Sequence, residues 1–217
     1  MYNDLVEFAP YLSFIVQGVF VTLKYSVAAV CFGLIIATFL AFCKVVDVKA
    51  LRLFAHAYTS IFRGTPVLIQ LIIVYYGLPG LIGIKLSVFS AGVLAFSLNS
   101  GAYVSEIIRS GINSVDKGQI EAAKALGVPP ILRMKDIILP QALRSILPAL
   151  VNELINLVKE SAIISVIGEM DLMRRAQVVS AETYTFFTPM LTAAATYYIM
   201  VLVISSFAMS LENRLAL

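Results

Sequence analysis

Residues 121–127 of this chain read Glu-Ala-Ala-Lys-Ala-Leu-Gly, and nine residues further on, residues 137–140 read Ile-Ile-Leu-Pro. The stretch that contains them is rich in charge, whereas long apolar runs precede and follow it. Its charged side chains are Asp116, Lys117, Glu121, Lys124, Arg133, Lys135 and Asp136. Because charged side chains are costly in hydrocarbon, this stretch cannot lie in lipid. It predicts a short polar segment that projects from a membrane domain and is available to a soluble partner.

The composition indicates a protein whose solvent is lipid. Of the 217 residues, 60% are hydrophobic and only 13% are charged, which is too little charge to cover a soluble domain of this size. In hydrocarbon every backbone polar group must be paired, so helices or a closed barrel are the options. The apolar runs reach roughly 20 residues or more, not the roughly 10 alternating residues of a barrel strand. We therefore expect an all-α membrane protein with a single transmembrane domain over residues 1–217.

Five transmembrane helices are expected from the apolar runs. The first run is too long for a cleaved signal peptide and lacks a basic leader, so it is expected to be retained. The second ends at residues 77–80, Gly-Leu-Pro-Gly, which is a turn signal. The predicted spans are about 12–42, 55–78, 87–108, 145–168 and 188–210.

The distribution of Lys and Arg predicts the orientation of the chain. Basic residues concentrate on cytoplasmic flanks of membrane helices. The flanks on the side of the charged stretch hold eleven of them: Lys44, Lys49, Arg52, Arg63, Arg109, Lys117, Lys124, Arg133, Lys135, Arg144 and Arg214. The other side holds three: Lys85, Arg174 and Arg175. We expect the N-terminus outside, the C-terminus inside and the segment 113–140 in the cytoplasm.

The cytoplasmic segment has the pattern of two short helices joined by a fixed bend. Residues 119–126 are mostly strong helix formers, and Gly127 tolerates the positive φ that ends a helix. Pro129 and Pro130 prevent continuation, and a helical pattern then resumes up to Pro140. The alternative interpretation is an ordinary amphipathic helix at the membrane surface.

The spacing of this segment resembles the signature loop of ABC importer permeases. The matched positions are Glu121, Ala122, Ala123, Gly127, Ile137, Leu139 and Pro140. Further stretches resemble the permease family for polar amino acids, which serves histidine, glutamine, glutamate, arginine and opines. They are residues 62–66 with 70–71, 75–79, 100–103, 106–112, 139–142, and 159–161 with 165–167. One departure is Ser161-Ala162-Ile163, where that family usually has Thr-Ser-Leu.

The resemblance implies a type I ABC importer permease in the plasma (inner) membrane of a prokaryote, crossing it several times. Segment 113–140 would be a coupling helix seated in a groove of a separate ATPase subunit, which would bind ATP and Mg²⁺. A second permease chain, identical or related, and an extracytoplasmic amino-acid-binding protein would complete the assembly. This sequence has no Gly-x-x-x-x-Gly-Lys-Ser/Thr loop. We therefore expect a transport subunit that is not an enzyme and carries no cofactor of its own.

The fourth predicted span carries a polar stripe that is a candidate substrate pathway. Ionisable side chains within a span are functional hypotheses by default. At 100° per residue, five polar side chains, three of them ionisable, fall on an arc of about 120°: Asn152, Glu153, Asn156, Lys159 and Glu160. A zwitterionic amino acid needs an acceptor for its ammonium and donors for its carboxylate, and this set supplies both.

The alternative is that Lys159 pairs with a glutamate and that the stripe only holds helices together. Asn99, Ser100 and Tyr103 in the third span are weaker candidates for the pathway, because polar packing explains them as well. Two glutamates on the stripe favour a cationic amino acid such as arginine, lysine or histidine, although any α-ammonium also needs a carboxylate.

Other classes of function have less support in the sequence. His56 is the only histidine, and Cys31 and Cys43 both belong to the first apolar run, so we expect no metal site. The sequence has no basic run with interleaved aromatic residues, so it does not predict nucleic-acid binding. The rival function is an ion-coupled secondary transporter or channel that uses the stripe, but such proteins usually show internal duplication, and no repeat is visible. An intramembrane enzyme would need a set of metal ligands or a Gly-x-Ser-x-Gly elbow, and this sequence has neither.

Overall fold

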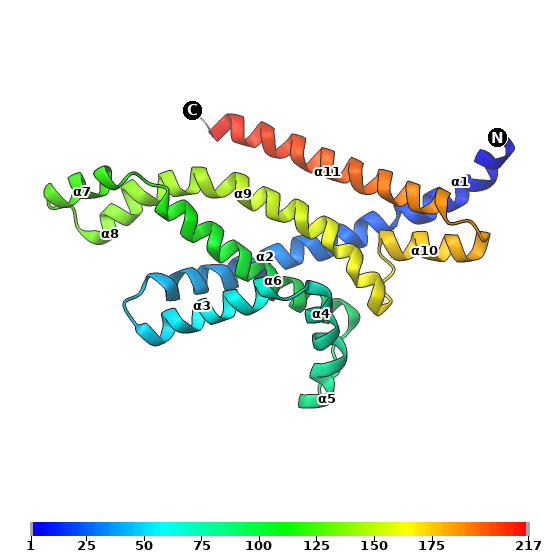
Figure 1. Cartoon of the computed structure of the whole chain (residues 1–217). Helices are drawn as coiled ribbons and strands as arrows, with labels where there is room; N and C mark the ends of the chain where they lie inside the picture. The colour runs from blue at the N-terminus through cyan, green and yellow to red at the C-terminus, as the bar shows by residue number, and fades with distance from the viewer. Residues whose placement is uncertain (1, 216–217) are drawn as a thin grey trace.

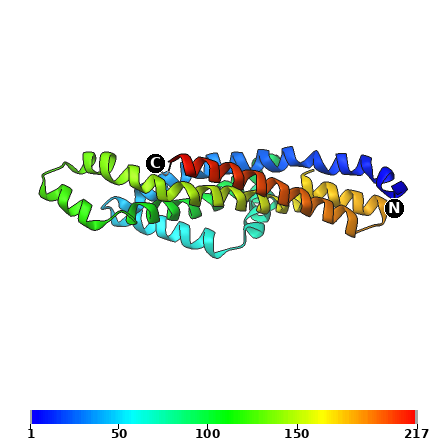
Figure 2. The same ribbon diagram turned by 90° about the horizontal axis from the view of Figure 1, so that it is seen from above.

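The computed structural model describes the backbone of residues 2–215 and the side chains of residues 9–210, and every regular element in that range is helical. The longest elements are α2 (Gly18–Val45), α6 (Val88–Asn113), α9 (Leu139–Glu160) and α11 (Phe187–Leu215). They run along the length of an elongated molecule (Figures 1 and 2). The all-α membrane fold expected from the sequence is confirmed.

Three of the predicted spans correspond to continuous stretches that are long and apolar enough to cross a membrane. Within the described residues these are Ala9–Val45, which joins α1 (Tyr2–Val16) to α2, then Val88–Asn113 and Phe187–Ser210. The fourth predicted span falls on α9. Its 22 residues give a length of about 33 Å, which is enough to cross hydrocarbon. Its polar residues make it less apolar than the other three, so the count of five spans stays a prediction.

The second predicted span, 55–78, is wrong as a single continuous helix. The chain forms α3 (Lys49–Gly64) and α4 (Val67–Ile72), and the two halves of the span are bent by 103°. Pro66 lacks an N–H group and forces the preceding Thr65 into extended backbone, with φ −123° and ψ 143°. The first helix therefore ends at Gly64, and the next one starts at Val67, directly after Pro66.

Two buried amides stabilise this break. Gln70 Nε2 donates to the carbonyl oxygens of Phe62 at 2.9 Å and Thr65 at 3.1 Å. Asn99 Nδ2, from α6, donates to the same Phe62 oxygen at 3.1 Å and to Gln70 Oε1 at 3.0 Å. Carbonyls that lose their helical partners at the break are thus satisfied inside the protein, as buried polar groups must be.

The turn predicted at residues 77–80 is also wrong. A π-helical segment, η1 (Ile73–Gly77), continues directly into α5 (Leu78–Ile82), and Gly77 has helical φ and ψ of −81° and −45°. Pro79 lies at the start of α5, directly after the π-helical segment. The helix ends instead at Gly83, whose φ of 73° suits only glycine.

Glycines let α2 and α6 approach each other closely. A Cβ atom at Gly101 would lie 2.6 Å from Ile36 Cγ2, and one at Gly92 would lie 2.5 Å from Tyr25 Cε1. Such distances are incompatible with a side chain unless the neighbour moves. The main buried core forms around this contact and includes Tyr25, Leu71, Phe96, Leu157 and Ile164.

The fourth predicted span, 145–168, differs from the structure at both ends. The α-helix α9 begins earlier, with Pro140 in its first turn. It ends at Glu160, and the remaining residues form a 3₁₀ helix, η3 (Ser161–Ile167), that stops at Gly168 with φ 88°. The segment up to α11 contains α10 (Leu172–Thr183), which begins with a cap from Asp171 Oδ1 to the N–H of Arg174 at 2.8 Å.

Candidate functional site

The signature segment forms the helix and bend that its sequence predicts. The helix α7 (Lys117–Ala125) begins where Asp116 Oδ1 accepts the N–H of Gln119. It ends at Ala125, and the chain turns away two residues later at Gly127, whose φ is 72°. The N–H of Gly127 bonds to the Lys124 carbonyl at 3.0 Å, and the N–H of Val128 bonds to the Ala123 carbonyl at 2.9 Å. These two bonds define a Schellman cap, which requires a left-handed residue at that glycine.

The chain returns from α7 through α8 (Pro130–Leu132) and the π-helical η2 (Arg133–Ile138) into α9. Together, α7, α8 and η2 form a projection at one end of the molecule, opposite the end that holds α1 and α10 (Figures 1 and 2). Large apolar side chains are exposed at its tip: Leu126 is 82% exposed and Ile131 is 81% exposed. A projecting tip with exposed apolar side chains is typical of a protein-binding surface.

The matched signature residues divide into an exposed set and an anchored set. Ala123 is buried and Ile137 is half-buried, whereas the other five are exposed: Glu121, Ala122, Gly127, Leu139 and Pro140. The segment is tied to the membrane helices by a small core that includes Val115 from the α6–α7 connection, Ile138 at the end of η2, and Ala142 and Ile146 from α9.

One side chain joins the helix α7 directly to α9. Gln141 Nε2 donates to Gln119 Oε1 at 2.7 Å and to the Ile137 carbonyl at 2.8 Å. Together with the Ile138 core, this bond makes the projection and the first turns of α9 a single packed unit. The helix α7 and the start of α9 are therefore joined both by apolar packing and by a side-chain hydrogen bond.

The polar stripe on α9 is not uniformly exposed. Asn156 and Lys159 are exposed, as is Asn152, whereas Glu160 is half-buried and Glu153 is buried. Lys159 has no carboxylate oxygen within 4.0 Å among the described side chains, so the predicted alternative of a Lys159–glutamate pair finds no support in its geometry. The stripe thus presents amide and ammonium groups outward and its carboxylates toward the neighbouring helices.

The three candidates on α6 occupy different environments. Ser100 is fully buried and lies beside Glu153, but no hydrogen bond of normal geometry joins the two groups. Asn99 donates its side-chain N–H groups to the Phe62 carbonyl and to Gln70 Oε1, so it stabilises the α3–α4 break. Tyr103 is 37% exposed, and the Arg63 guanidinium lies over its ring in a cation–π contact, 5.2 Å from the ring centre. The structure therefore brings Ser100 to the stripe and places Tyr103 nearer to α3.

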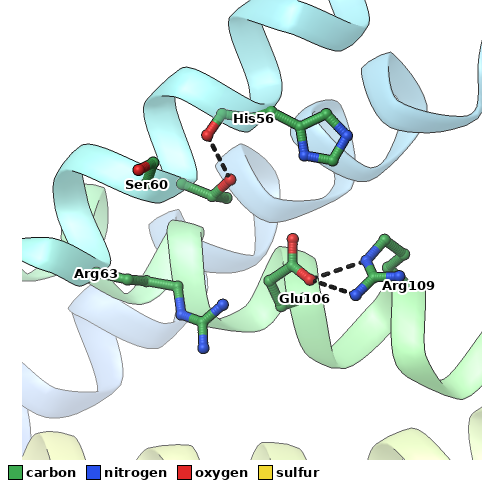
Figure 3. Close-up of a pocket in the computed structure, with 6 residues that line it drawn as sticks. His56, Ser60, Arg63, Glu106 and Arg109 are labelled. Carbon is green, nitrogen blue, oxygen red and sulfur yellow. Dashed lines mark hydrogen bonds and ion pairs between the residues drawn. The ribbon is translucent and has the colours of Figure 1, made fainter.

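A cavity of about 430 Å³ lies between α3 and α6 (Figure 3). It is lined by His56, Thr59, Ser60, Arg63, Glu106 and Arg109. The α3 residues were not predicted as a site. The available signal was their spacing at i, i+3, i+4 and i+7, which puts four polar side chains on one helical face.

A charged network forms one wall of the cavity. Lys44 Nζ from α2 lies 2.6 Å from Glu106 Oε1, and it also donates to Ser105 Oγ at 3.0 Å. Arg109 lies 2.8 Å from Glu106 Oε2. Both carboxylate oxygens of Glu106 are therefore occupied, and Glu106 forms a structural pair with Arg109 at this end of α6.

Comparison with known proteins identifies the family. Residues 29–217 match the family described as binding-protein-dependent transport system inner membrane component. A Rickettsia conorii protein provisionally named a glutamine transport system permease is 65% identical over 215 residues, 99% of each chain. The arginine transport system permease protein of Bacillus subtilis is 50% identical over 212 residues, 98% of this chain and 97% of that protein.

Two solved structures share the fold. A crystal structure of an amino acid ABC transporter with histidines has a chain that matches with a TM-score of 0.91 and 42% identity, over 99% of this chain and 98% of that one. Inward-facing structures of a methionine ABC transporter match with a TM-score of 0.78 and 22% identity, over 95% and 98%, which supports the fold alone. The resemblance to ABC permeases is confirmed, and a secondary transporter or channel is not favoured. The chain belongs to the family of inner-membrane components of binding-protein-dependent transport systems and is a permease subunit of an ABC importer.

Proposed function

We propose that this chain is the transmembrane subunit of an ATP-driven importer of polar or charged amino acids. The observation that supports this most strongly is the α7–η2 projection, whose signature residues surround a capped helix with an exposed apolar tip. The amino-acid class is supported by relatives named for glutamine and arginine transport. Between those two substrates, the carboxylates of Glu153 and Glu160 favour a cationic amino acid.

The projection is the coupling element. Exposed Glu121, Ala122 and Gly127 contact a groove on a separate ATPase subunit, which holds the ATP and Mg²⁺. The tip side chains Leu126 and Ile131 are buried on docking, since leaving them exposed would be unfavourable. The half-buried and adjoining residues Ile137, Leu139 and Pro140, with Ala123, transmit the motion through the packed unit to α9.

The substrate passes along the polar side of α9. Glu153 and Glu160 accept the cationic groups of the amino acid, which are the α-ammonium and the side chain of a cationic substrate. Asn156 and Lys159 donate to the α-carboxylate, with Ser100 and Tyr103 on α6 as neighbouring groups. The grouping is supported by its depth, because Glu153 and Glu160 lie on either side of Leu157, a residue of the main buried core. In this arrangement α9 is the fourth crossing along the chain and brings the total to five. Its polar side faces the pathway instead of lipid, which explains its low apolarity.

The complete importer has further components. A second permease chain, identical or related, completes the pathway, and an extracytoplasmic binding protein delivers the amino acid. The chain crosses the plasma membrane of a prokaryote several times, with the N-terminus outside. Its exposed apolar side chains on α2 and α11, such as Phe20 and Phe207, contact lipid or the second permease chain.

A pair of variants tests the coupling assignment. Gly127→Val places a β-branched residue at φ 72° but creates no packing clash, because nothing lies within 4 Å of the new Cβ. The left-handed conformation then costs about 1–2 kcal/mol, which would reduce the docked fraction about tenfold. ATP-driven uptake of labelled arginine or glutamine into proteoliposomes should fall accordingly. Gly80→Val, an equally open site with negative φ, is the matched control.

Charge reversal provides a second arm. Glu121→Lys should abolish uptake while the permease still inserts, whereas Lys49→Glu, an exposed reversal at the start of α3, should not. Full uptake by both loop variants would contradict the coupling role.

For the pathway, Glu153→Gln and Glu160→Gln should alter transport kinetics, with exposed Glu182→Gln as control. Normal kinetics in both would make these glutamates structural, and a competition series over the amino acids identifies the substrate.

A further inference from the structure

The cavity between α3 and α6 has an excess of positive charge that no described side chain balances. Glu106 is its one lining carboxylate, and both of its oxygens are already taken by Lys44 and Arg109. No carboxylate oxygen among the described side chains lies within 4.0 Å of the Arg63 guanidinium, which contacts the face of the Tyr103 ring instead. In Figure 3, Arg63 and Arg109 lie on either side of Glu106 at the cavity wall.

The remaining polar groups of the cavity are two hydroxyls and an imidazole, which add no negative charge to it. Thr59 uses its hydroxyl within α3, donating to the carbonyls of Ala55 and His56. Ser60 and His56 are exposed at the cavity and present a hydroxyl and an imidazole that donate to no acceptor among the described residues. Arginine is well suited to bidentate binding of a planar carboxylate, and serine adds one further donor. The chemistry of the cavity is therefore that of an anion site.

The cavity lies nearer than the α9 stripe to the end of α6 that leads into the projection. Ser100, beside Glu153, and Glu106, at the cavity, are six residues apart on α6, a rise of about 9 Å. Tyr103, which contacts Arg63, lies between them. Toward the inside, the charged groups change from a mixed set at Glu153, Lys159 and Glu160 to a set with net positive charge at the cavity. A substrate moving inward would therefore reach the stripe first and the cavity second.

We propose that this cavity is a release site that binds the α-carboxylate of the transported amino acid on the cytoplasmic side of the stripe. The proposal rests on the proposed import function. Arg63 is the principal ligand, Ser60 and His56 are supporting donors, and Arg109 contributes positive charge while it remains paired with Glu106. An amino acid that accumulates in the cytoplasm occupies this site and slows further import.

The test uses the complete permease–ATPase complex in proteoliposomes loaded with ATP and with rising internal concentrations of L-arginine or L-glutamine. Internal amino acid should inhibit uptake by the unaltered complex. Arg63→Gln should raise the half-inhibitory internal concentration about tenfold or more, since a charge-assisted hydrogen bond is lost. Lys49→Gln, the same charge change elsewhere on α3, should leave it unchanged. Internal agmatine, which is arginine without its carboxylate, should not inhibit.

Milder variants and a change of lipid complete the test of the carboxylate site. If Arg63→Gln does not assemble, Ser60→Ala and His56→Gln are tested in its place. Each should raise the half-inhibitory internal concentration, by less than Arg63→Gln would. An unchanged inhibitory concentration in these variants, inhibition by agmatine equal to that by arginine, or no internal inhibition at all would overturn the site. An Arg63→Gln effect that requires phosphatidylglycerol and disappears in phosphatidylcholine vesicles would assign the cavity to a lipid phosphate and overturn the carboxylate. Failure of the proposed import function would be distinct, because the unaltered complex would then import neither amino acid.

Discussion

The α2–α6 contact and the α7 projection both depend on glycine, but for opposite reasons. At Gly101 and Gly92 the backbone has no need of glycine, and the neighbouring helix leaves no room for a Cβ atom. At Gly127 there is open space on all sides, and the backbone conformation itself requires glycine. Substitutions in the first region should therefore damage the fold, whereas a substitution in the second should spare the fold and damage the connection to a partner.

The largest effect on stability is expected at the α2–α6 contact. Gly101→Val would push the Ile36 side chain out of its position, and overpacking of this kind costs about 3 kcal/mol. Thermal unfolding of the detergent-solubilised permease should occur at a clearly lower temperature. Adding Ile36→Ala to Gly101→Val should recover part of the loss, because it removes the clashing atoms. A double variant no more stable than Gly101→Val would show that the glycine is not there for packing.

A somewhat smaller loss is expected at the α3–α4 break. Gln70→Leu removes the donors to the Phe62 and Thr65 carbonyls and the acceptor for Asn99, which leaves buried polar groups without partners. The expected cost is about 2 kcal/mol, measured by the same thermal unfolding. Gln177→Leu, an amide removed from α10, is the control. Equal stability of Gln70→Leu and the unaltered chain would contradict the role given to this amide.

The smallest effect concerns pH and the segment before α10. Asp171 is fully buried, and burial, together with the nearby Glu169 charge, raises its pKa from 3.8 to about 6 in spite of bonds from the Arg174 and Met173 N–H groups. The folded state therefore binds this proton more tightly than the unfolded state. Its contribution to stability is greatest below about pH 4, decreases as pH rises to about 6, and is level above that.

Between pH 5 and pH 7 the permease should lose about 1 kcal/mol of stability from this group. Asp171→Asn keeps an acceptor for the Arg174 cap but removes the ionisation. The variant should therefore lack this part of the pH dependence, as measured by unfolding at the two pH values. An identical pH dependence in the variant would show that another group is responsible.

The sequence was most informative where a local rule decides the structure. Gly127 and the following prolines predicted the end of α7, and the long apolar runs predicted the spans at Ala9–Val45, Val88–Asn113 and Phe187–Ser210. The second span was drawn straight across the break at Pro66, although Arg63, Gly64 and Thr65 before it are not apolar. A proline within an apolar run signals a break, but the bend of 103° depends on Gln70 and Asn99, which are distant in sequence.

The candidate site was less predictable because it depends on which helices are neighbours. Helical periodicity placed Glu153 and Asn156 on one arc, yet only the packing of α9 against α6 buries Glu153 beside Ser100 and leaves Asn156 exposed. The α3–α6 cavity was missed for the same reason. Arg63 belongs to a motif that also breaks the helix, and its position opposite Arg109 follows from the tertiary structure.

Cross-linking at the projection is the sharpest test of its role in coupling. In a Cys31→Ser, Cys43→Ala background, Leu126→Cys places a thiol at the tip of α7, and Leu81→Cys places an equally exposed one on α5; the two leucines are 82% and 83% exposed. A short bis-maleimide, followed by detection of the ATPase subunit, reports which thiol lies beside that subunit. We expect capture of the ATPase from Leu126→Cys and none from Leu81→Cys. Capture from Leu81→Cys, or no capture from Leu126→Cys in an assembled and active complex, would contradict the coupling role of α7.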